Sequence, residues 1–215
     1  MARETSQTLD RGLTVLELLG RRPDGMTVNE LANALGVGRT VVYRLVATLE
    51  DHALVRRDSE GKVRLWLGVV PLARAVQPLL RGTALPVLRR LADDVGATAH
   101  LTVADGAESL AVAVVEPARS DLHVAYREGA RHPMDKGAAG RALLRLREGN
   151  PGLVASVGEL QSGAHGIAAP VMGVPGVEAS VGVVVLGPLD PAVVGPMVLA
   201  AAADLALLLA PRARG

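Results

Sequence analysis

The chain has 215 residues, of which 49% are hydrophobic, and its 23 Lys or Arg and 22 Asp or Glu give a net charge of +1. This length suffices for two modest domains, and the apolar content excludes a disordered chain. The sequence contains no cysteine, which excludes disulfides, thiolate metal sites and a cysteine nucleophile and fits the reducing cytoplasm, where we expect the protein.

The first predicted element is a helix over residues 8–19. Four leucines recur in it at helical spacing and are expected to lie on one side: Leu9, Leu13, Leu16 and Leu19. This side would complete the core of a small three-helix domain.

Residues 27–50 are typical of a helix-turn-helix. Thr27 and Glu30 have the spacing of a capping box, so a helix should begin at Val28. Gly36 then ends it, because glycine readily takes the left-handed conformation of a C-terminal cap. The expected apolar stripe of this helix comprises Leu31, Ala34 and Leu35.

A second helix follows the glycine turn at residues 36–38. Its buried face is predicted from the i, i+3, i+4, i+7 spacing of Val42, Leu45, Val46 and Leu49. The other face, near the amino-terminal end, is the part of a recognition helix that enters the major groove of DNA. It carries Arg39, Thr40, Val41, Tyr43 and Arg44. Val41 either packs locally or contacts a thymine methyl group.

A small hairpin is predicted over residues 54–65, where apolar and polar residues alternate around a Ser-Glu-Gly turn. It carries four basic residues that we expect to grip phosphates: Arg56, Arg57, Lys62 and Arg64. The first 64 residues hold nearly as many acids as bases, but acids such as Glu17, Asp24 and Glu30 belong to other elements. The succession predicts a winged helix-turn-helix that binds double-stranded DNA. The alternatives are a winged helix that mediates protein association and basic residues that form only a solvated face.

A linking helix is predicted over residues 67–80, with interruptions at Pro71 and Pro78 and an end at Gly82. The expected domains are therefore residues 1–66, a linker at 67–82 and a second domain at 83–215. This second domain should begin with an amphipathic helix that ends at Gly96 and is built on Leu85, Leu88, Leu91 and Val95.

The second domain is predicted to be a mainly antiparallel sheet with helices, an α+β architecture of the ligand-sensor type. Asp-Gly in the 105–107 connection favours a hairpin turn. A helix over 136–146 has Asp135 as its expected N-cap. The expected strands cover residues 98–104, 108–115, 122–126, 167–172 and 180–186.

The chain ends in an apolar run over residues 193–210 that contains Gly195-Pro196 and Asp204. We expect it to be too short and broken to span a membrane, and to form a buried helix starting at Pro196. Residues 1–7 are polar and do not resemble a secretory signal. No membrane partner is therefore expected.

Enzymatic function is not indicated. The sequence lacks a Gly-x-Ser-x-Gly elbow, a His-Glu-x-x-His motif, a phosphate loop and a Gly-x-Gly-x-x-Gly fingerprint. The five histidines, at positions 52, 100, 123, 132 and 165, lack the spacing of metal ligands. We expect no catalytic residue, no metal and no cofactor.

The whole chain resembles the IclR family of bacterial transcription regulators. The matching segments occur in the family's order: residues 9–19, 27–32, 43–50, the hairpin, 98–106, His132-Pro133-Met134, 140–144 and 167–171. The resemblance implies a winged helix-turn-helix domain, a linker helix and a GAF-like effector-binding domain, in a homodimer or a dimer of dimers. The opening helix would help to form the dimer. Dimer symmetry predicts an inverted-repeat operator, and the family's usual effectors are small metabolites, often carboxylic or aromatic acids.

Six residues match or adjoin the pocket-lining segments of the family: His100, Thr102, Asp135, Lys136, Gly137 and Gly166. Amides at the helix start near Lys136 could hold an anionic group. The structural alternatives are a satisfied histidine on a strand, a plain N-cap and a solvent-exposed lysine.

Several positions depart from the family pattern. Gly166 replaces the family's usual cysteine, and Val184 and Leu186 match positions that are usually polar. A brief stretch rich in Gly, Pro and Ser replaces a longer helical segment that helps to cover the pocket, so a lid is expected to be missing. Either the effector is more apolar than usual, or the domain has lost sensing and serves for oligomerisation.

Overall fold

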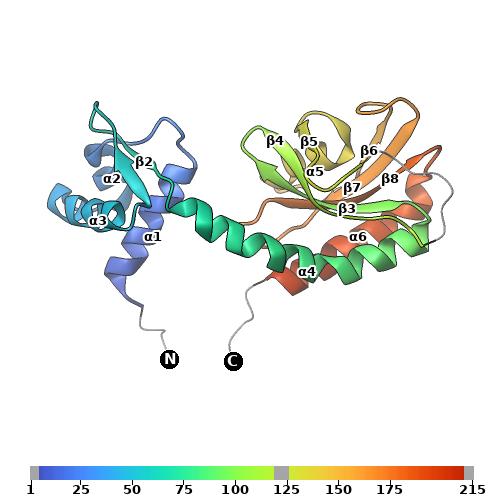
Figure 1. Cartoon of the computed structure of the whole chain (residues 1–215), viewed down its shortest axis with the longest axis horizontal. Helices are drawn as coiled ribbons and strands as arrows, with labels where there is room; N and C mark the ends of the chain where they lie inside the picture. Colours follow the sequence, from blue (N-terminus) through green and yellow to red (C-terminus); the bar gives the residue numbers. More distant parts are fainter. Residues whose placement is uncertain (1–4, 119–125, 211–215) are drawn as a thin grey trace. The chain divides into compact units, whose positions relative to one another are not determined.

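The computed structural model describes residues 5–118 and 126–210 (Figure 1). The chain divides into two compact units, Met1–Val76 and Gln77–Gly215. The architecture is α+β, with a helix-turn-helix region in the first unit and an antiparallel sheet in the second. The predicted strand over 122–126 lies outside the described residues except for Tyr126, which belongs to no strand.

The first unit contains three helices and a two-stranded hairpin. They are α1 (Gln7–Gly20), α2 (Val28–Leu35), α3 (Arg39–Asp51), β1 (Val55–Arg57) and β2 (Val63–Leu65). The strands pair in antiparallel register, with Arg56 opposite Arg64. Met26 adds a bridge to Val63, through backbone hydrogen bonds in both directions, which joins the loop before α2 to the hairpin.

Helix α1 presents a different face to the core from the one predicted. Val15 and Leu19 are buried, whereas Leu9 and Leu13 are 62% and 51% exposed. The buried face includes Gly12, which approaches the Leu45 side chain of α3. Because Gly12, Val15 and Leu19 share the stripe that meets α3, the prediction for Leu9 and Leu13 was wrong.

The capping box of α2 is present. The Thr27 hydroxyl accepts from the Glu30 amide at 3.2 Å, and Glu30 accepts from the Thr27 amide at 2.7 Å. This backbone hydrogen bond is the main reason why the pKa of Glu30 is lowered. Gly36 ends the helix with φ at 64°. The predicted stripe was wrong at Ala34, which is exposed, because the core face runs through Val28, Leu31 and Ala32.

The linker is one continuous helix, α4 (Val69–Val95), with Pro78 and Pro86 inside it. The boundary between the two units falls within this helix. Each internal proline removes one backbone hydrogen bond, but the helix continues through both and through Gly82. The predicted break and the end at Gly82 were therefore wrong. Beyond Gly82, burial of Ala84, Leu88 and Leu91 in the core of the second unit stabilises the helix.

The second unit is built on a six-stranded antiparallel sheet with the order β5-β4-β3-β8-β7-β6. The strands are β3 (Thr98–Asp105), β4 (Glu108–Val115), β5 (Arg131–Pro133), β6 (Val154–Val157), β7 (Ala164–Pro170) and β8 (Ala179–Leu186). The β3–β4 hairpin and the β7–β8 pair match the prediction, although β7 begins earlier, at Ala164. Sequence reasoning did not predict the short strands β5 and β6.

Helices cover both faces of this sheet. Helices α4 and α6 (Pro191–Leu209) pack on one face in the main core, with Leu101, Ile167 and Val183 from the strands. Helix α5 (Gly137–Arg147) lies on the other face, where Ala138 and Ala142 cluster with Val154 and Ala168 (Figure 1). Alternation along the strands therefore places His100, Gly166 and Val184 on the α5 face.

Both helix starts in this unit differ from the prediction. Lys136, not Asp135, is the N-cap of α5, and it makes no capping side-chain hydrogen bond. Helix α6 begins at Pro191 rather than Pro196, because Asp190 caps it by accepting from the Ala192 amide at 2.9 Å. Pro196 is tolerated inside the helix.

Helix α6 is long and apolar enough to cross a membrane by length and composition alone, so the expectation of a run too short to span was wrong. Its buried face packs against β7 and β8, as a core helix does. A membrane-spanning helix and the core helix of a soluble protein share this length and composition. In this structure one face of α6, about 33% of its apolar window, is buried.

Candidate DNA-binding surface and ligand cavity

Helix α3 separates an apolar face from a polar one. Val42, Leu45, Val46 and Leu49 are buried in the core of the first unit. The residues predicted to reach DNA are all exposed, within its first two turns: Arg39, Thr40, Val41, Tyr43 and Arg44. Gly38 is the N-cap and offers no side chain to the first-turn amides. A helix start of this kind leaves amides available to a phosphate oxygen.

Several contacts join α3 to the hairpin, which has the position of a wing. Arg57 Nε lies 3.6 Å from Glu50 Oε2. The backbone amide of Arg57 donates to Glu50 Oε1 at 3.2 Å. The Arg57 guanidinium carbon lies 5.2 Å from the centre of the Tyr43 ring. Arg57 is half-buried as a result. The exposed face of α3 and the wing are therefore held together by side chains as well as by the backbone.

The wing carries its own acids, which sequence reasoning did not weigh. Arg64 Nε donates to Asp58 Oδ2 at 3.0 Å, and Lys62 Nζ lies 3.4 Å from Glu60 Oε2. Burial opposes the ionisation of Asp58, but hydrogen bonds from the Lys62 and Glu60 amides and from Arg64 outweigh it and lower the pKa of Asp58. Part of the wing's positive charge is thus neutralised within the wing.

Arg56 lies opposite Arg64 in the hairpin. Its guanidinium carbon is 4.7 Å from the centre of the Trp66 ring, a cation–π contact. Together with Arg57, Asp58, Ser59 and Arg64 these two side chains line a surface hollow. Arg56 and Arg64 are exposed, whereas Arg57 and Lys62 are partly buried.

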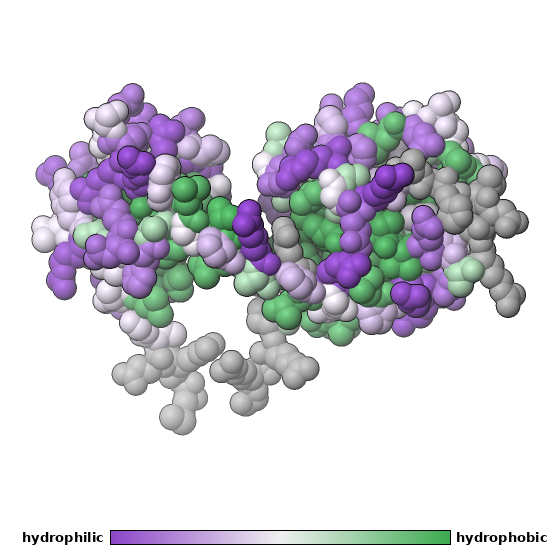
Figure 2. Space-filling view, in the orientation of Figure 1, coloured by the Kyte–Doolittle hydropathy of each residue, from purple (hydrophilic) through white to green (hydrophobic). Residues whose placement is uncertain are grey.

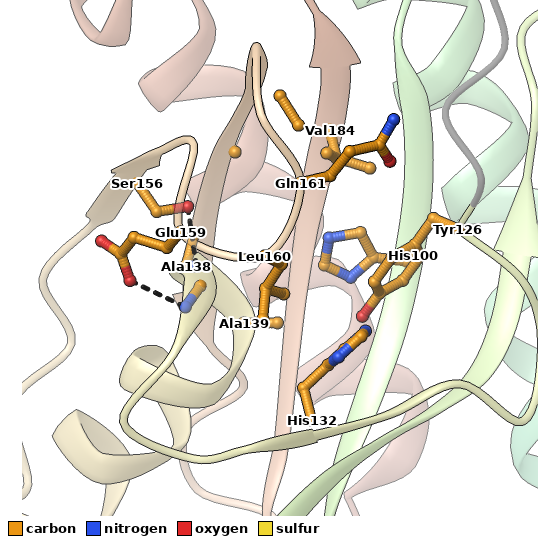
Figure 3. Close-up of a pocket in the computed structure, with 13 residues that line it drawn as sticks. His100, Tyr126, His132, Ala138, Ala139, Ser156, Glu159, Leu160, Gln161 and Val184 are labelled. Atoms are coloured by element: carbon orange, nitrogen blue, oxygen red, sulfur yellow. Dashed lines mark hydrogen bonds between the residues drawn. The ribbon is translucent and has the colours of Figure 1, made fainter.

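The second unit contains a cavity of about 130 Å³ on the α5 face of the sheet (Figure 3). Strands β3, β7 and β8, the start of α5 and the loop between β6 and β7 contribute to its wall. The lining residues are His100, Tyr126, His132, Gly137, Ala138, Ala139, Ser156, Glu159, Leu160, Gln161, Ala164, Gly166 and Val184. We call it the α5 cavity.

Three rings form one side of the α5 cavity (Figure 3). The Tyr126 ring centre lies 4.9 Å from that of His100 and 5.8 Å from that of His132. Burial lowers the pKa of His100 to about 4, and the nearby His132 adds to the shift. Burial also lowers the pKa of His132 and raises that of Tyr126. All three rings are consequently uncharged at neutral pH.

The opposite side holds two side chains that cap α5 (Figure 3). The Gly137 amide donates to Glu159 Oε2 at 2.8 Å, and the Ala138 amide donates to Ser156 Oγ at 3.0 Å. Glu159 Oε1 also pairs with Arg141 Nη1 at 2.5 Å. A Cβ on Gly166 would lie 3.1 Å from Ser156 Oγ, so the missing side chain at position 166 leaves room for this cap.

Three of the six predicted effector residues line the α5 cavity: His100, Gly137 and Gly166. Thr102 is fully buried behind it, where a 3.2 Å hydrogen bond joins its hydroxyl to His100 Nδ1. Asp135 and Lys136 are exposed and are not among the lining residues. Val184, predicted to make this region more apolar, does line the cavity.

Sequence reasoning missed most of the polar lining. Tyr126, His132, Ser156, Glu159 and Gln161 were not proposed as effector residues, although all line the cavity. His132 is the one for which a signal existed, because it belongs to a segment that matches the family. The β6–β7 connection contributes Glu159, Leu160 and Gln161 to the wall.

Two family profiles match the chain. The IclR helix-turn-helix domain matches residues 8–59, and the bacterial transcriptional regulator IclR C-terminal domain matches residues 75–151. The HTH-type transcriptional regulator KipR of Bacillus subtilis is 30% identical over 142 residues, which are 65% of this chain and 56% of that protein. The acetate operon repressor of Salmonella typhimurium is 28% identical over 142 residues, 64% of this chain and 52% of the repressor. The chain thus spans about half the length of these curated relatives.

Solved structures share the fold over nearly the whole chain. The IclR-family regulator RHA1_ro06953 from Rhodococcus sp. has a TM-score of 0.61 at 21% identity and covers 98% of this chain and 99% of its own. An IclR homolog from Microbacterium hydrocarbonoxydans, solved in complex with 4-hydroxybenzoate, has a TM-score of 0.54 at 20% identity, with coverages of 94% and 99%. At these identities the likeness concerns the fold.

Proposed function

The chain belongs to the IclR family of bacterial transcription regulators, and from this membership we propose that it regulates transcription by binding operator DNA. The observation that carries the proposal is the exposed polar face of α3 beside the wing. In a winged helix-turn-helix, such a face reads base edges in the major groove while the wing contacts the backbone.

The roles of the side chains follow from their positions. Arg39, Thr40, Tyr43 and Arg44 enter the major groove, and Val41, which is 37% exposed, meets a thymine methyl group. The wing grips phosphates through Arg56, Arg57, Lys62 and Arg64. Because Asp58 and Glu60 already neutralise part of the wing, the affinity depends on few phosphate contacts and is only moderate.

We propose that the protein binds as a homodimer, alone or as a dimer of dimers. Leu9 and Leu13 leave an apolar stripe exposed on α1, which a second copy would cover. Figure 2 shows that hydrophobic residues also reach the surface of the second unit. Two-fold symmetry then calls for an inverted-repeat operator.

The α5 cavity is the proposed effector site. It combines apolar walls with a few polar groups, as ligand sites do. The fold-related homolog solved with 4-hydroxybenzoate supports a small molecule as the effector. We place the regulator in the cytoplasm, where operator DNA and metabolites are both available, and assign it no catalytic role.

One observation favours a second candidate function. Since Asp58, Glu60 and Glu50 each lie beside a basic residue of the wing, the wing's acids and bases would also suit contact with another protein. In that case the winged helix mediates association and the chain is a sensor or oligomerisation module.

The test is selection of duplex DNA from a random pool, with Arg44→Ala in parallel. Arg89→Ala, an exposed arginine on α4, is the matched control. Recovery of a palindromic site by the wild type and the control, but not by Arg44→Ala, supports the DNA-reading role. Failure to enrich any duplex at low salt, with protein shown to be folded and dimeric, favours the association role.

A further inference from the structure

The first two amide groups of α5 are already satisfied by the chain itself. Glu159 accepts from the Gly137 amide and Ser156 accepts from the Ala138 amide, at 2.8 and 3.0 Å. A helix start usually attracts an anion because its amides and its dipole point at the ligand. In the α5 cavity a built-in carboxylate holds that position.

Glu159 also determines the charge of the α5 cavity. Among its described lining residues, Glu159 is the one group that carries a full charge at neutral pH, since the two histidines and Tyr126 are uncharged there. The cation that balances Glu159 is Arg141, which is not part of the lining. A second carboxylate that entered the cavity would lose its hydration and face a like charge.

The remaining wall suits a flat, mostly apolar molecule. The rings of His100, Tyr126 and His132 stand opposite Leu160 and the capped start of α5 (Figure 3). The cavity measures about 130 Å³, and an apolar cavity of about 150 Å³ holds benzene. The size is therefore about that of a single six-membered ring, which leaves little room beyond small substituents.

The hydrogen-bonding groups of the wall determine which substituents the ring can carry. His100 uses Nδ1 toward Thr102, and its Nε2 takes no part in that bond. The Tyr126 hydroxyl and the Gln161 side chain also belong to residues of the wall. Hydroxyl or amide substituents match such neutral groups, and they make no demand on the α5 amides.

We propose that the α5 cavity selects an uncharged single-ring aromatic molecule with hydroxyl or amide substituents and rejects the matching carboxylate, with Glu159 as the residue that sets this choice. The inference rests on the proposed function, in which this cavity takes the effector. This ligand preference would distinguish the protein from a regulator whose cavity binds an aromatic acid.

The test uses two probes of nearly identical shape, 4-hydroxybenzamide and 4-hydroxybenzoate. Each is titrated into the full-length wild type, Glu159→Gln and Glu148→Gln, with the amide NMR signals of Gly137, Ala138 and Gly166 as the readout. Gln keeps one acceptor oxygen for the Gly137 amide, and it removes the charge and the second oxygen that pairs with Arg141. Glu148 is exposed at the other end of α5, so Glu148→Gln removes the same charge away from the cavity.

The wild type and Glu148→Gln should bind the amide at least about tenfold more tightly than the acid, whereas Glu159→Gln should reduce or reverse the preference. The proposal is overturned by wild-type protein that binds the acid as tightly as the amide, by failure of the amide to move these signals, or by an unchanged preference in a folded Glu159→Gln. If that variant does not fold, the comparison of the two probes in the wild type decides.

DNA binding by the same preparations separates this proposal from the proposed function. Recovery of an operator together with equal binding of both probes would overturn the ligand class and leave the regulator intact. Discrimination between the probes without any recovered duplex would support the ligand class and count against DNA reading.

Discussion

The carboxylate of Glu159 caps Gly137 across 22 residues of sequence, with 2.8 Å between Oε2 and the amide nitrogen. Its other oxygen, Oε1, holds Arg141 on the next turn of α5. One side chain from the β6–β7 connection therefore fixes the start of a helix that has no local side-chain cap. This contact ties the wall of the α5 cavity to the helix that borders it.

Glu159→Ala should loosen the first turn of α5. Loss of a helix cap costs about 1 kcal/mol, and the Arg141 pair is lost with it. We expect faster hydrogen exchange at the α5 amides in Glu159→Ala and a smaller effect in Glu159→Gln, which retains an acceptor. Glu148→Ala is the control. Unchanged exchange in Glu159→Ala would show that the cap adds nothing to helix stability.

Stability of the second unit should fall in mild acid because of His100. Its pKa is about 4 in the folded protein, below the ordinary value of 6.5, so the unfolded chain takes up the proton first as the pH falls. The contribution of neutral His100 is complete above pH 6.5 and is lost between 6.5 and 4, with a total of about 3 kcal/mol.

Urea unfolding of the wild type and His100→Gln between pH 7.5 and 5 measures this loss, and the variant should show a weaker pH dependence. His52→Gln, at the exposed carboxyl end of α3, is the control. In NMR titrations the His100 ring should keep its neutral shift down to pH 5. Titration near 6.5 would contradict the assignment.

Arg44 and Lys62 should affect DNA binding in different ways. Arg44→Ala should weaken specific binding far more than nonspecific binding, because a base contact carries the sequence information. Lys62→Ala should weaken both about equally and reduce the slope of log K against log salt by about 1. Anisotropy titrations on operator and random duplexes across a salt series measure both effects. Equal losses at the two positions on both duplexes would rule out this division of roles.

Asp58→Asn should strengthen DNA binding. Asp58 Oδ1 accepts from the Glu60 and Lys62 amides, at 3.0 and 2.9 Å, and Oδ2 holds Arg64. Asn keeps one acceptor oxygen for the turn, removes the negative charge and releases Arg64 toward phosphate. The same salt series should show tighter binding and a slope steeper by about 1. Glu17→Gln, on α1, controls for net charge, and an unchanged slope in Asp58→Asn would mean that Arg64 does not reach DNA.

The sequence was most informative where structure depends on near neighbours. The capping box at Thr27, the glycine end at Gly36 and the buried face of α3 involve residues within a few positions of each other, so spacing alone predicts them. Asp190 followed by Pro191 is a local helix start of the same kind. The prediction of a start at Pro196 was wrong because both prolines suit a helix start and Pro196 is tolerated inside α6.

Long-range packing explains the remaining errors. Spacing placed Leu9 and Leu13 on an apolar stripe, but the approach of Gly12 to Leu45 decides which stripe of α1 is buried. No sequence pattern near Gly137 predicts that Glu159 caps its amide. The two residues come into contact only when β6 and β7 pair. The polar side of the α5 cavity was unpredictable for this reason.

Trp66 is the single tryptophan of the chain, and its ring lies against Arg56 on the wing. The fluorescence of an indole depends on how far its ring is exposed to water, and here that fluorescence arises from one known residue. A partner that moves the Arg56 guanidinium away from the ring, or that covers the ring, therefore changes the fluorescence emission of Trp66. The unlabelled protein therefore contains its own optical reporter of wing occupancy.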